Sequence, residues 1–247
     1  MARPILVVKV GTSTLLDAHE RPVSTFDIVA RSICELTDEY RIVLITSGAI
    51  GFGVRHLGLA ARPHAVAQLQ ALSMLGQVGL MERWNAAFGA RPIGQVLITR
   101  HDLTDADERA LLTRSIEAMW AYGALPIVNE NDAVASDEIS FGDNDRLAAE
   151  LAVRIGAESL VLLTDQDGIQ ENFGTAGQRR LKSARIEQAQ RHITAQTSGV
   201  GRGGAASKLE AASIAVAGGV QAYIASARDQ NVLRRAMAGA VGTKIVQ

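Results

Sequence analysis

Two lysines that lie almost at opposite ends of the chain stand beside residues suited to phosphate. Lys9 ends an apolar run and is followed by a turn at residues 11–13, whose backbone N–H groups and hydroxyls could hold an anion. Lys208 follows the glycine-rich residues 199–204 and enters an apolar helical pattern, at a spacing that differs from a Walker A motif. Taken singly, a solvated lysine at a strand end and a plain glycine linker would explain these two sites.

Acidic and amide side chains gather at two places in the middle of the chain, residues 129–132 and 143–145. A helix cap needs only one such side chain, for which Asp143 would suffice. The density of both groups instead favours recognition of an amino acid's ammonium group and a hold on a metal or on lysines. A third turn, residues 46–48, precedes a helix whose free N–H groups could bind an anion, although Ser47 could simply cap that helix.

None of these clusters contains a histidine. A carboxylate with a pKa of ~4.3 is already a nucleophile at neutral pH, so its phosphorylation requires no catalytic base. The site must instead bring two anions into line and neutralise the charge of the phosphoryl group, which lysines, backbone N–H groups and Mg2+ can do. The clusters therefore fit phosphoryl transfer better than any other chemistry.

Short apolar runs rich in β-branched residues predict the strands that must position these groups. They lie at residues 5–10, 41–46, 94–99, 125–128, 160–164 and 220–225. Helical spacing between them predicts an α/β fold, a three-layer sandwich around a mostly parallel sheet, with ligands at the carboxyl ends of the strands. The run at residues 5–10 is apolar enough to be central. Residues 170–204 are polar and poorly periodic, and we expect a mobile loop there that contains one helix.

The composition of the 247-residue chain, 47% hydrophobic and 21% charged, indicates a single globular domain over residues 1–247. A net charge of −1 argues for a small metabolite as partner, with no nucleic acid and no membrane. No run approaches the ~18 to 20 apolar residues of a membrane span, and Lys9 interrupts the first apolar run, so we expect a cytoplasmic protein. Cys34, the single cysteine, lies between Ile33 and Leu36 in a helical pattern, which predicts a buried thiol.

Together these clusters resemble the amino acid kinase family over nearly the whole chain, and in particular its members that phosphorylate L-glutamate. The segments that carry the resemblance are residues 8–13, 46–50, 94–97, 128–134, 142–145, 163–168 and 241–243. The pair Asn-Glu-Asn-Asp-Ala-Val and Gly-Asp-Asn-Asp, at residues 129–134 and 142–145, is the most specific part. Family members that act on acetylglutamate, aspartate, UMP or carbamate carry different residues there.

The resemblance implies that ATP, with Mg2+, phosphorylates L-glutamate to L-glutamyl 5-phosphate, the first step of proline synthesis. It implies substrate binding mainly by residues up to about 155, including Ser47, Asp132 and Asn144, and nucleotide binding mainly by the rest. Lys9 and Lys208 would act on the phosphates, and Asp145 would orient the lysines or the metal. The residues expected to bind the nucleotide are Lys9, Gly11, Thr164, Asp165, Arg202, Gly203, Gly204, Ala205, Ala206, Ser207 and Lys208. Mg2+ would be held mainly by ATP, with Asp145 or Asp143 as protein ligands, and a dimer or tetramer is expected.

The chain departs from the family pattern around the nucleotide. Arg202, Ala205 and Ser207 stand where threonine, methionine and threonine are usual, and residues 169–173 replace a common Leu-Tyr-Thr-x-Asp-Pro. Many relatives also carry a further RNA-modification-type domain, which we expect this form to lack. Two alternatives stay open: a kinase for another carboxylate or amino acid, and a degenerate kinase that acts as a ligand-binding regulator. Simple ligand binding would not need Lys9, Lys208, Asp143 and Asp145 together, which favours an enzyme.

Overall fold

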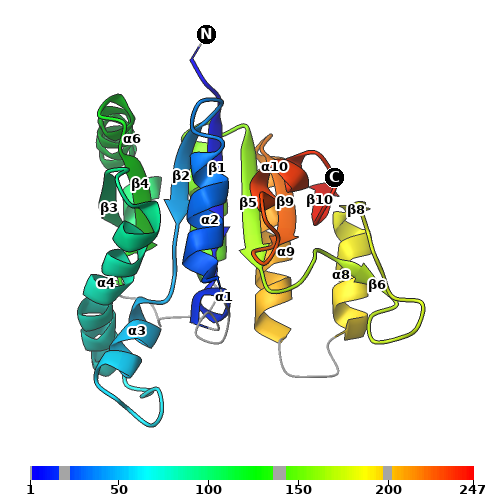
Figure 1. Ribbon diagram of the computed structural model, residues 1–247, viewed down its shortest axis with the longest axis horizontal. Helices are drawn as coiled ribbons and strands as arrows, with labels where there is room; N and C mark the ends of the chain where they lie inside the picture. Colours follow the sequence, from blue (N-terminus) through cyan, green and yellow to red (C-terminus); the bar gives the residue numbers. More distant parts are fainter. Residues whose placement is uncertain (1, 17–22, 136–142, 197–201) are drawn as a thin grey trace.

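The computed structural model describes residues 2–16, 23–135, 143–196 and 202–247. Its main sheet has eight strands, ordered β3-β4-β2-β1-β5-β9-β10-β8 (Figure 1). In that order their bounds are Ile93–Ile98, Leu125–Glu130, Arg41–Ile45, Ile5–Val10, Ser159–Thr164, Gln221–Ser226, Thr243–Val246 and Ser183–Arg185. A separate two-stranded ribbon joins β6 (Gln170–Glu171) to β7 (Arg179–Arg180). As predicted, β1 is central, and all six of its residues are buried.

Helices cover both faces of this sheet and form the outer layers of the predicted three-layer sandwich. In chain order they are α1 (Thr12–Leu16), α2 (Thr25–Cys34), α3 (Ala49–His56), α4 (Val66–Phe88), α5 (Arg100–Thr104), α6 (Ala106–Ala121), α7 (Asp143–Arg154), α8 (Ile186–Gln196), α9 (Arg202–Ala217) and α10 (Val232–Met237). Alternate residues of β1 enter different cores: Val7 packs in a cluster with residues of α7 and α9, and Leu6 and Val8 pack in one with residues of α2 and α4. No helix in the described ranges has the length and apolar character needed to cross a membrane.

The six predicted strands are all present, and β1 runs parallel to its neighbours β2 and β5. Two further strands of the main sheet, β8 and β10, were not predicted from the sequence. The apolar signal of each is too short to stand alone, and each becomes a strand by pairing: β10 runs antiparallel to β9, and β8 pairs with β10.

Two expectations from the sequence are wrong. Residues 170–204 do not form one mobile loop, because the described part of this segment contains β6, β7, β8, the start of α9 and the expected helix, α8, which buries Ala189 and Ile193. Residues 197–201 lie outside the described residues. Cys34 is exposed at the end of α2, because the helix turns Ile33 into the core and leaves the next side chain at the surface.

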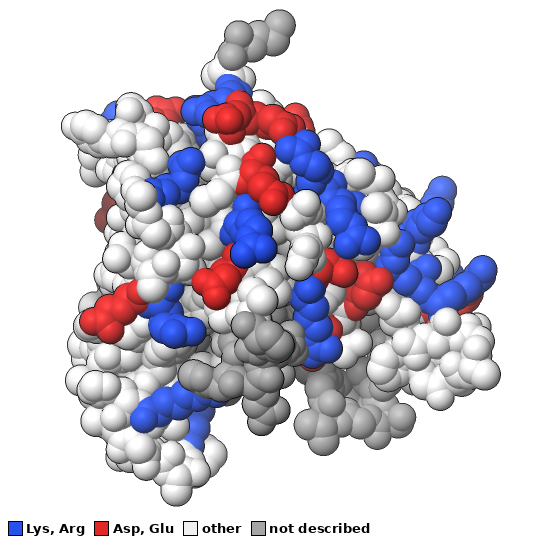
Figure 2. All heavy atoms as spheres, in the orientation of Figure 1, with Lys and Arg blue, Asp and Glu red and all other residues white. Residues whose placement is uncertain are grey.

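Charged side chains of both signs are interspersed over the face shown in Figure 2. This distribution agrees with the net charge of −1 for the chain. It differs from the single-sign surface that steers a protein onto a polyanion.

The helices α3 and α4 cross so closely that their backbones touch. A Cβ atom placed on Gly76 would lie 1.9 Å from the carbonyl oxygen of Ala49, and one on Gly53 would lie 2.1 Å from that of Leu72. Glycine at both positions is therefore required by the packing. The crossing fixes the start of α3, where Gly48 adopts a φ of 109° three residues beyond β2.

We predict that Gly76→Ala lowers the free energy of unfolding by about 1–3 kcal/mol, because the new methyl group must displace the backbone of α3. Gly79→Ala is the matched control on the same helix, since its Cβ would lie 3.5 Å from the nearest atom, in the ring of Phe52. It should be neutral or stabilise by up to about 1 kcal/mol through helix propensity. Denaturant unfolding of both variants measures the difference, and equal stabilities would refute the close crossing.

Candidate active site

A buried carboxylate joins the two lysines that the sequence singled out. The Nζ atom of Lys9 lies 2.5 Å from Oδ1 of Asp145, and that of Lys208 lies 3.1 Å from Oδ2. Lys9 shares the face of β1 that α7 and α9 cover, while Asp145 and Lys208 come from those two helices. Their exposed fractions are 3% for Lys9, 1% for Asp145 and 8% for Lys208. Strand and helix packing therefore assemble the cluster that the sequence keeps apart.

Electrostatics leave this cluster suited to an anion. Burial raises the pKa of Asp145, but the two lysines outweigh that effect and hold its pKa below the usual range. Burial lowers the pKa of Lys9 and Lys208 lowers it further, while Asp145 opposes both effects. Two ammonium groups share one carboxylate, so an anionic ligand that also contacted the lysines would complete the charge balance.

Gly11, directly after β1, lies beside both ammonium groups. A Cβ atom at this position would lie 3.6 Å from Nζ of Lys9 and 4.0 Å from Nζ of Lys208, at ordinary van der Waals distance, so the backbone of Gly11 adjoins both lysines. The neighbouring strand β5 ends at Thr164, whose hydroxyl donates a hydrogen bond of 3.1 Å to Asp165. The ends of β1 and β5 thus place four of the expected nucleotide-binding residues at one edge of the sheet.

The start of α9 supplies the rest of the expected nucleotide site. The hydroxyl of Ser207 donates to Oδ2 of Asp145 at 3.0 Å, and Lys208 reaches the carbonyl oxygen of Gly204 at 3.5 Å. Ala205 packs against the core cluster that contains Leu209. Ala206, next to Ser207, belongs to the same helix. Arg202 and Gly203 begin α9, but their side-chain positions, like that of Asp143, lie outside the described residues.

Asn144 ties α7 to the ends of two strands on the other side of β1. Its Nδ2 atom donates to the carbonyl oxygen of Thr46 at 2.8 Å, to the hydroxyl of Ser47 at 3.1 Å and to Oδ1 of Asn129 at 2.8 Å. The alternative that Ser47 caps the following helix is wrong, because Gly48 occupies the N-cap position and no side chain caps it. The structure thus brings Ser47 and Asn144 together beside the lysine cluster.

Two residues of α4 support this network, and the sequence reading missed both. The indole N–H of Trp84 donates to the hydroxyl of Thr46 at 2.9 Å, and Oε1 of Gln77 accepts a bond of 2.9 Å from Nδ2 of Asn129. In the sequence they belong to a long apolar helix, where they read as ordinary core positions. The usable signal was Gln77 itself, an amide about two turns from Trp84 on the buried side of the helix.

Asp132 lies two residues beyond β4 and takes no part in the three hydrogen bonds of Asn144. Its side chain is partly buried, and this burial raises its pKa to about 6, although the nearby charge of Arg62 works in the opposite direction. A cationic ligand would stabilise the ionised form of this carboxylate, because its charge would offset the free-energy cost of burying the ion.

Two other segments that carry the family resemblance, residues 163–168 and 241–243, lie largely in loops that hydrogen bonds join to one another. The backbone N–H of Gly242 donates to Oδ1 of Asp167 at 2.9 Å, and the N–H of Ile169 donates to the hydroxyl of Thr243 at 2.8 Å. A Cβ atom on Gly168 would lie 2.4 Å from that hydroxyl, so the contact requires glycine. These bonds attach the loop after β5 to the start of β10.

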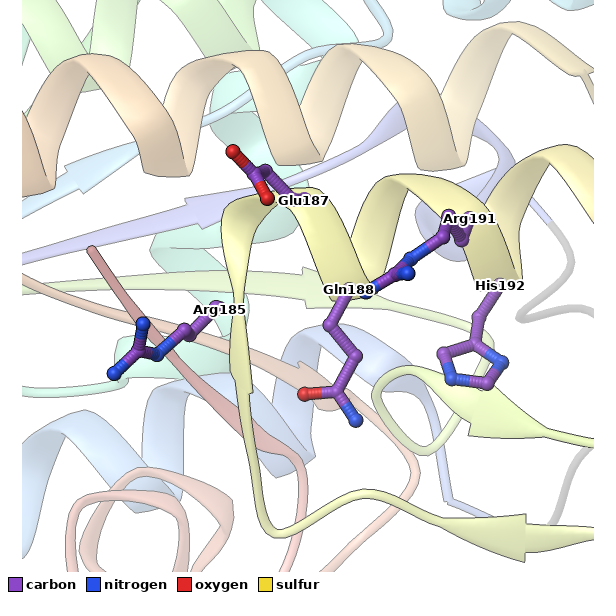
Figure 3. Close-up of a pocket in the computed structure, with 5 residues that line it drawn as sticks. All are labelled: Arg185, Glu187, Gln188, Arg191 and His192. Carbon is purple, nitrogen blue, oxygen red and sulfur yellow. The ribbon is translucent and has the colours of Figure 1, made fainter.

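A hollow at the edge of the sheet formed by β8 is separate from this site (Figure 3). Its lining comes from the end of β8 and from α8: Arg185, Glu187, Gln188, Arg191 and His192. In the described part of the chain no group of three or more histidine, cysteine, aspartate or glutamate side chains could hold a metal ion.

The profile of the amino acid kinase family matches residues 4–226. The chain is 41% identical to glutamate 5-kinase of Gloeobacter violaceus, over 97% of this chain and 67% of that protein. It is 39% identical to glutamate 5-kinase of Symbiobacterium thermophilum, over 95% of this chain and 92% of that one. Among solved structures, carbamate kinase from Giardia lamblia bound to AMP-PNP aligns with a TM-score of 0.68 at 14% identity, covering 99% of both chains, which shows a shared fold.

Proposed function

The chain belongs to the amino acid kinase family, in its glutamate 5-kinase branch, and we propose that it transfers the γ-phosphoryl group of ATP to the side-chain carboxylate of L-glutamate. The product would be L-glutamyl 5-phosphate, which begins proline biosynthesis. The observation that carries this proposal is the buried cluster of Lys9, Asp145 and Lys208, with Gly11 beside both ammonium groups. It offers two cations to a transferring phosphoryl group and needs no catalytic base.

In this mechanism the lysines act on the phosphoryl group and Asp145 positions them. Salt bridges to both carboxylate oxygens hold the ammonium groups before ATP arrives, so little reorganisation is needed when charge develops. The hydroxyl of Ser207 further orients the carboxylate. Mg2+ would neutralise charge on the phosphates, and ATP would hold it mainly through its own oxygens, because both oxygens of Asp145 already face lysines.

Glutamate would bind on the β2 and β4 side of the cluster. We assign its ammonium group to Asp132, whose carboxylate is partly buried, and its carboxylates to the Ser47 hydroxyl, which accepts from the Asn144 amide and keeps its own proton to donate. Trp84 and Gln77 would act through Thr46 and Asn129 as positioning residues. Residues up to about 155 would thus bind mainly the substrate.

The nucleotide would occupy the β5 and α9 side, with the residues after 155. Thr164 and Asp165 lie at the end of β5, and residues 202–208 begin α9. We propose that Arg202 adds a cation for the polyphosphate and that residues 169–173 alter the pocket for the base. A cytoplasmic location is part of the same proposal.

A coupled ADP-release assay tests the activity, and we expect turnover with L-glutamate, ATP and Mg2+ well above that with aspartate or acetylglutamate. Lys9→Ala and Lys208→Ala should each lower kcat roughly a hundredfold, because each removes about 3 kcal/mol of stabilisation from the transition state. Lys182→Ala, at an exposed lysine, is the matched control and should keep normal turnover. Inactivity on all three acids would reject the function, and a normal kcat would remove that lysine from the mechanism.

Asp132→Ala should raise the KM for glutamate roughly ten- to a hundredfold with little change in kcat, since the ammonium charge is the same in ground and transition states. Glutarate lacks the amine and should be a poor substrate for the parent protein. The variant should discriminate against it much less. Undiminished preference for glutamate in the variant would contradict this assignment.

The pH profile gives the same assignment a second test. With its pKa raised to about 6, Asp132 is ionised at pH 7.5 and gains a proton as the pH falls through 6. The kcat/KM for glutamate of the parent should therefore fall below pH 6. The kcat/KM of Asp132→Asn should be low throughout and should not show this fall near pH 6.

We also propose a homo-oligomer that buries the outer face of α4. This helix is apolar on both sides: Leu72 and Leu80 face the core, while Met74, Leu75 and Val78 are 54%, 46% and 63% exposed. Helices that are apolar all round are normally covered. Leu97, on the edge strand β3, is also exposed, and an exposed edge strand is normally covered or protected.

Val78→Asp should therefore shift the protein to monomers in sedimentation-velocity analysis, because an isologous interface would place the new charge in it twice. Val23→Asp, at an exposed valine outside this face, is the control and should leave the assembly intact. A monomeric parent protein would overturn the proposal.

A further inference from the structure

A second hollow lies at the end of the sheet opposite the lysine cluster. It has a volume of about 530 Å³, within the usual range of small-molecule pockets. Its lining comes from the residues before or at the start of four strands: Arg3 before β1, Arg41 and Ile42 in β2, Arg91 and Pro92 before β3, and Ala124 and Leu125 at β4. Three of these strands, β1, β2 and β4, have residues of the candidate active site at their carboxyl ends. One strand length, ~20 Å, separates the two sites.

Three guanidinium groups face this hollow, and none of them forms a salt bridge with a described residue. Arg3 donates to the carbonyl oxygen of Thr37, and Nε of Arg41 donates to the carbonyl oxygen of Arg3 at 3.0 Å. Arg91 donates to the hydroxyl of Thr37 at 2.9 Å and to the carbonyl oxygen of Gly123 at 3.4 Å. These bonds fix the arginines in place and leave several N–H donors of each unused by them.

The walls of the hollow are also fixed and partly apolar. The guanidinium carbon of Arg41 lies 4.9 Å from the ring centroid of Trp120, and the indole N–H donates to the carbonyl oxygen of Ile42 at 2.9 Å. Pro92 and Leu125 add apolar surface. Asp38 is the one carboxylate in the lining, and three guanidinium groups outweigh it.

From this arrangement we propose a second ligand site, which binds a small molecule through a phosphate or carboxylate group. The oxyanion would accept hydrogen bonds from Arg41 and Arg91, and the rest of the ligand would lie against Trp120. Fixed guanidinium forks suit such oxyanions, because two N–H groups of one arginine can donate in parallel. The site is independent of the proposed catalytic function and lies outside the substrate and nucleotide sites.

Calorimetric titration of the full chain tests this site, with glutamate and a non-hydrolysable ATP analogue present to occupy the active site. Inorganic phosphate and succinate are titrated separately, which distinguishes a phosphate ligand from a carboxylate ligand. We expect saturable binding of at least one probe with a Kd on the order of 1 mM or below. Absence of saturable binding by either probe in the parent protein would overturn the proposal, whatever the variants do.

The variant Arg41→Gln/Arg91→Gln should weaken that binding at least tenfold, because it removes both guanidinium forks. Arg31→Gln/Arg114→Gln, at exposed arginines of α2 and α6 outside the lining, is the charge-matched control and should bind as the parent does. Equal weakening by the control would mean unspecific charge attraction and would refute the site, as would unchanged binding in the double variant. Arg91→Lys is the milder change, and its affinity for the probe should lie between those of the parent and the double variant. It replaces the double variant in this test if that variant does not fold.

Discussion

The buried contact of one carboxylate with two lysines is the interaction on which the rest of the site depends. Asp145 could not remain charged in the core without Lys9 and Lys208, and the lysines could not be held so close together without it. Each partner comes from a different element, so β1, α7 and α9 must pack in one relative position. The packing of these three elements and the charge balance of the cluster therefore depend on each other.

A second constraint comes from the close approach of backbones next to the substrate side. Gly53 and Gly76 let α3 and α4 cross at contact distance, and the crossing fixes the start of α3 at Gly48, three residues beyond β2. Through Trp84 the same helix α4 supports the turn at Thr46. Packing on one face of the sheet is thus transmitted to the strand ends where glutamate would bind, and the outer face of α4 is left apolar.

The carboxyl and amino ends of the strands carry different kinds of residues, and the topology of the sheet explains this difference. Parallel strands bring all their carboxyl ends to one edge, where loops turn into helices and leave free N–H groups and small residues. The amino ends follow the loops that return from the helices, and here Arg41, the first residue of β2, and Arg91, just before β3, lie there. In this protein the sheet therefore has lysines at one edge and arginines at the other.

The sequence by itself determined the strands with long apolar runs, the parallel α/β class and the residues at the lysine cluster. Those signals are local, because β-branched runs and polar strand ends can be read within a few residues. Tertiary structure alone decided that Asp145 pairs with both lysines, that Trp84 and Gln77 support the site, and that Cys34 is exposed. It also decided that β8 and β10 are strands. Each of these depends on contacts between residues far apart in the chain, which no local pattern records.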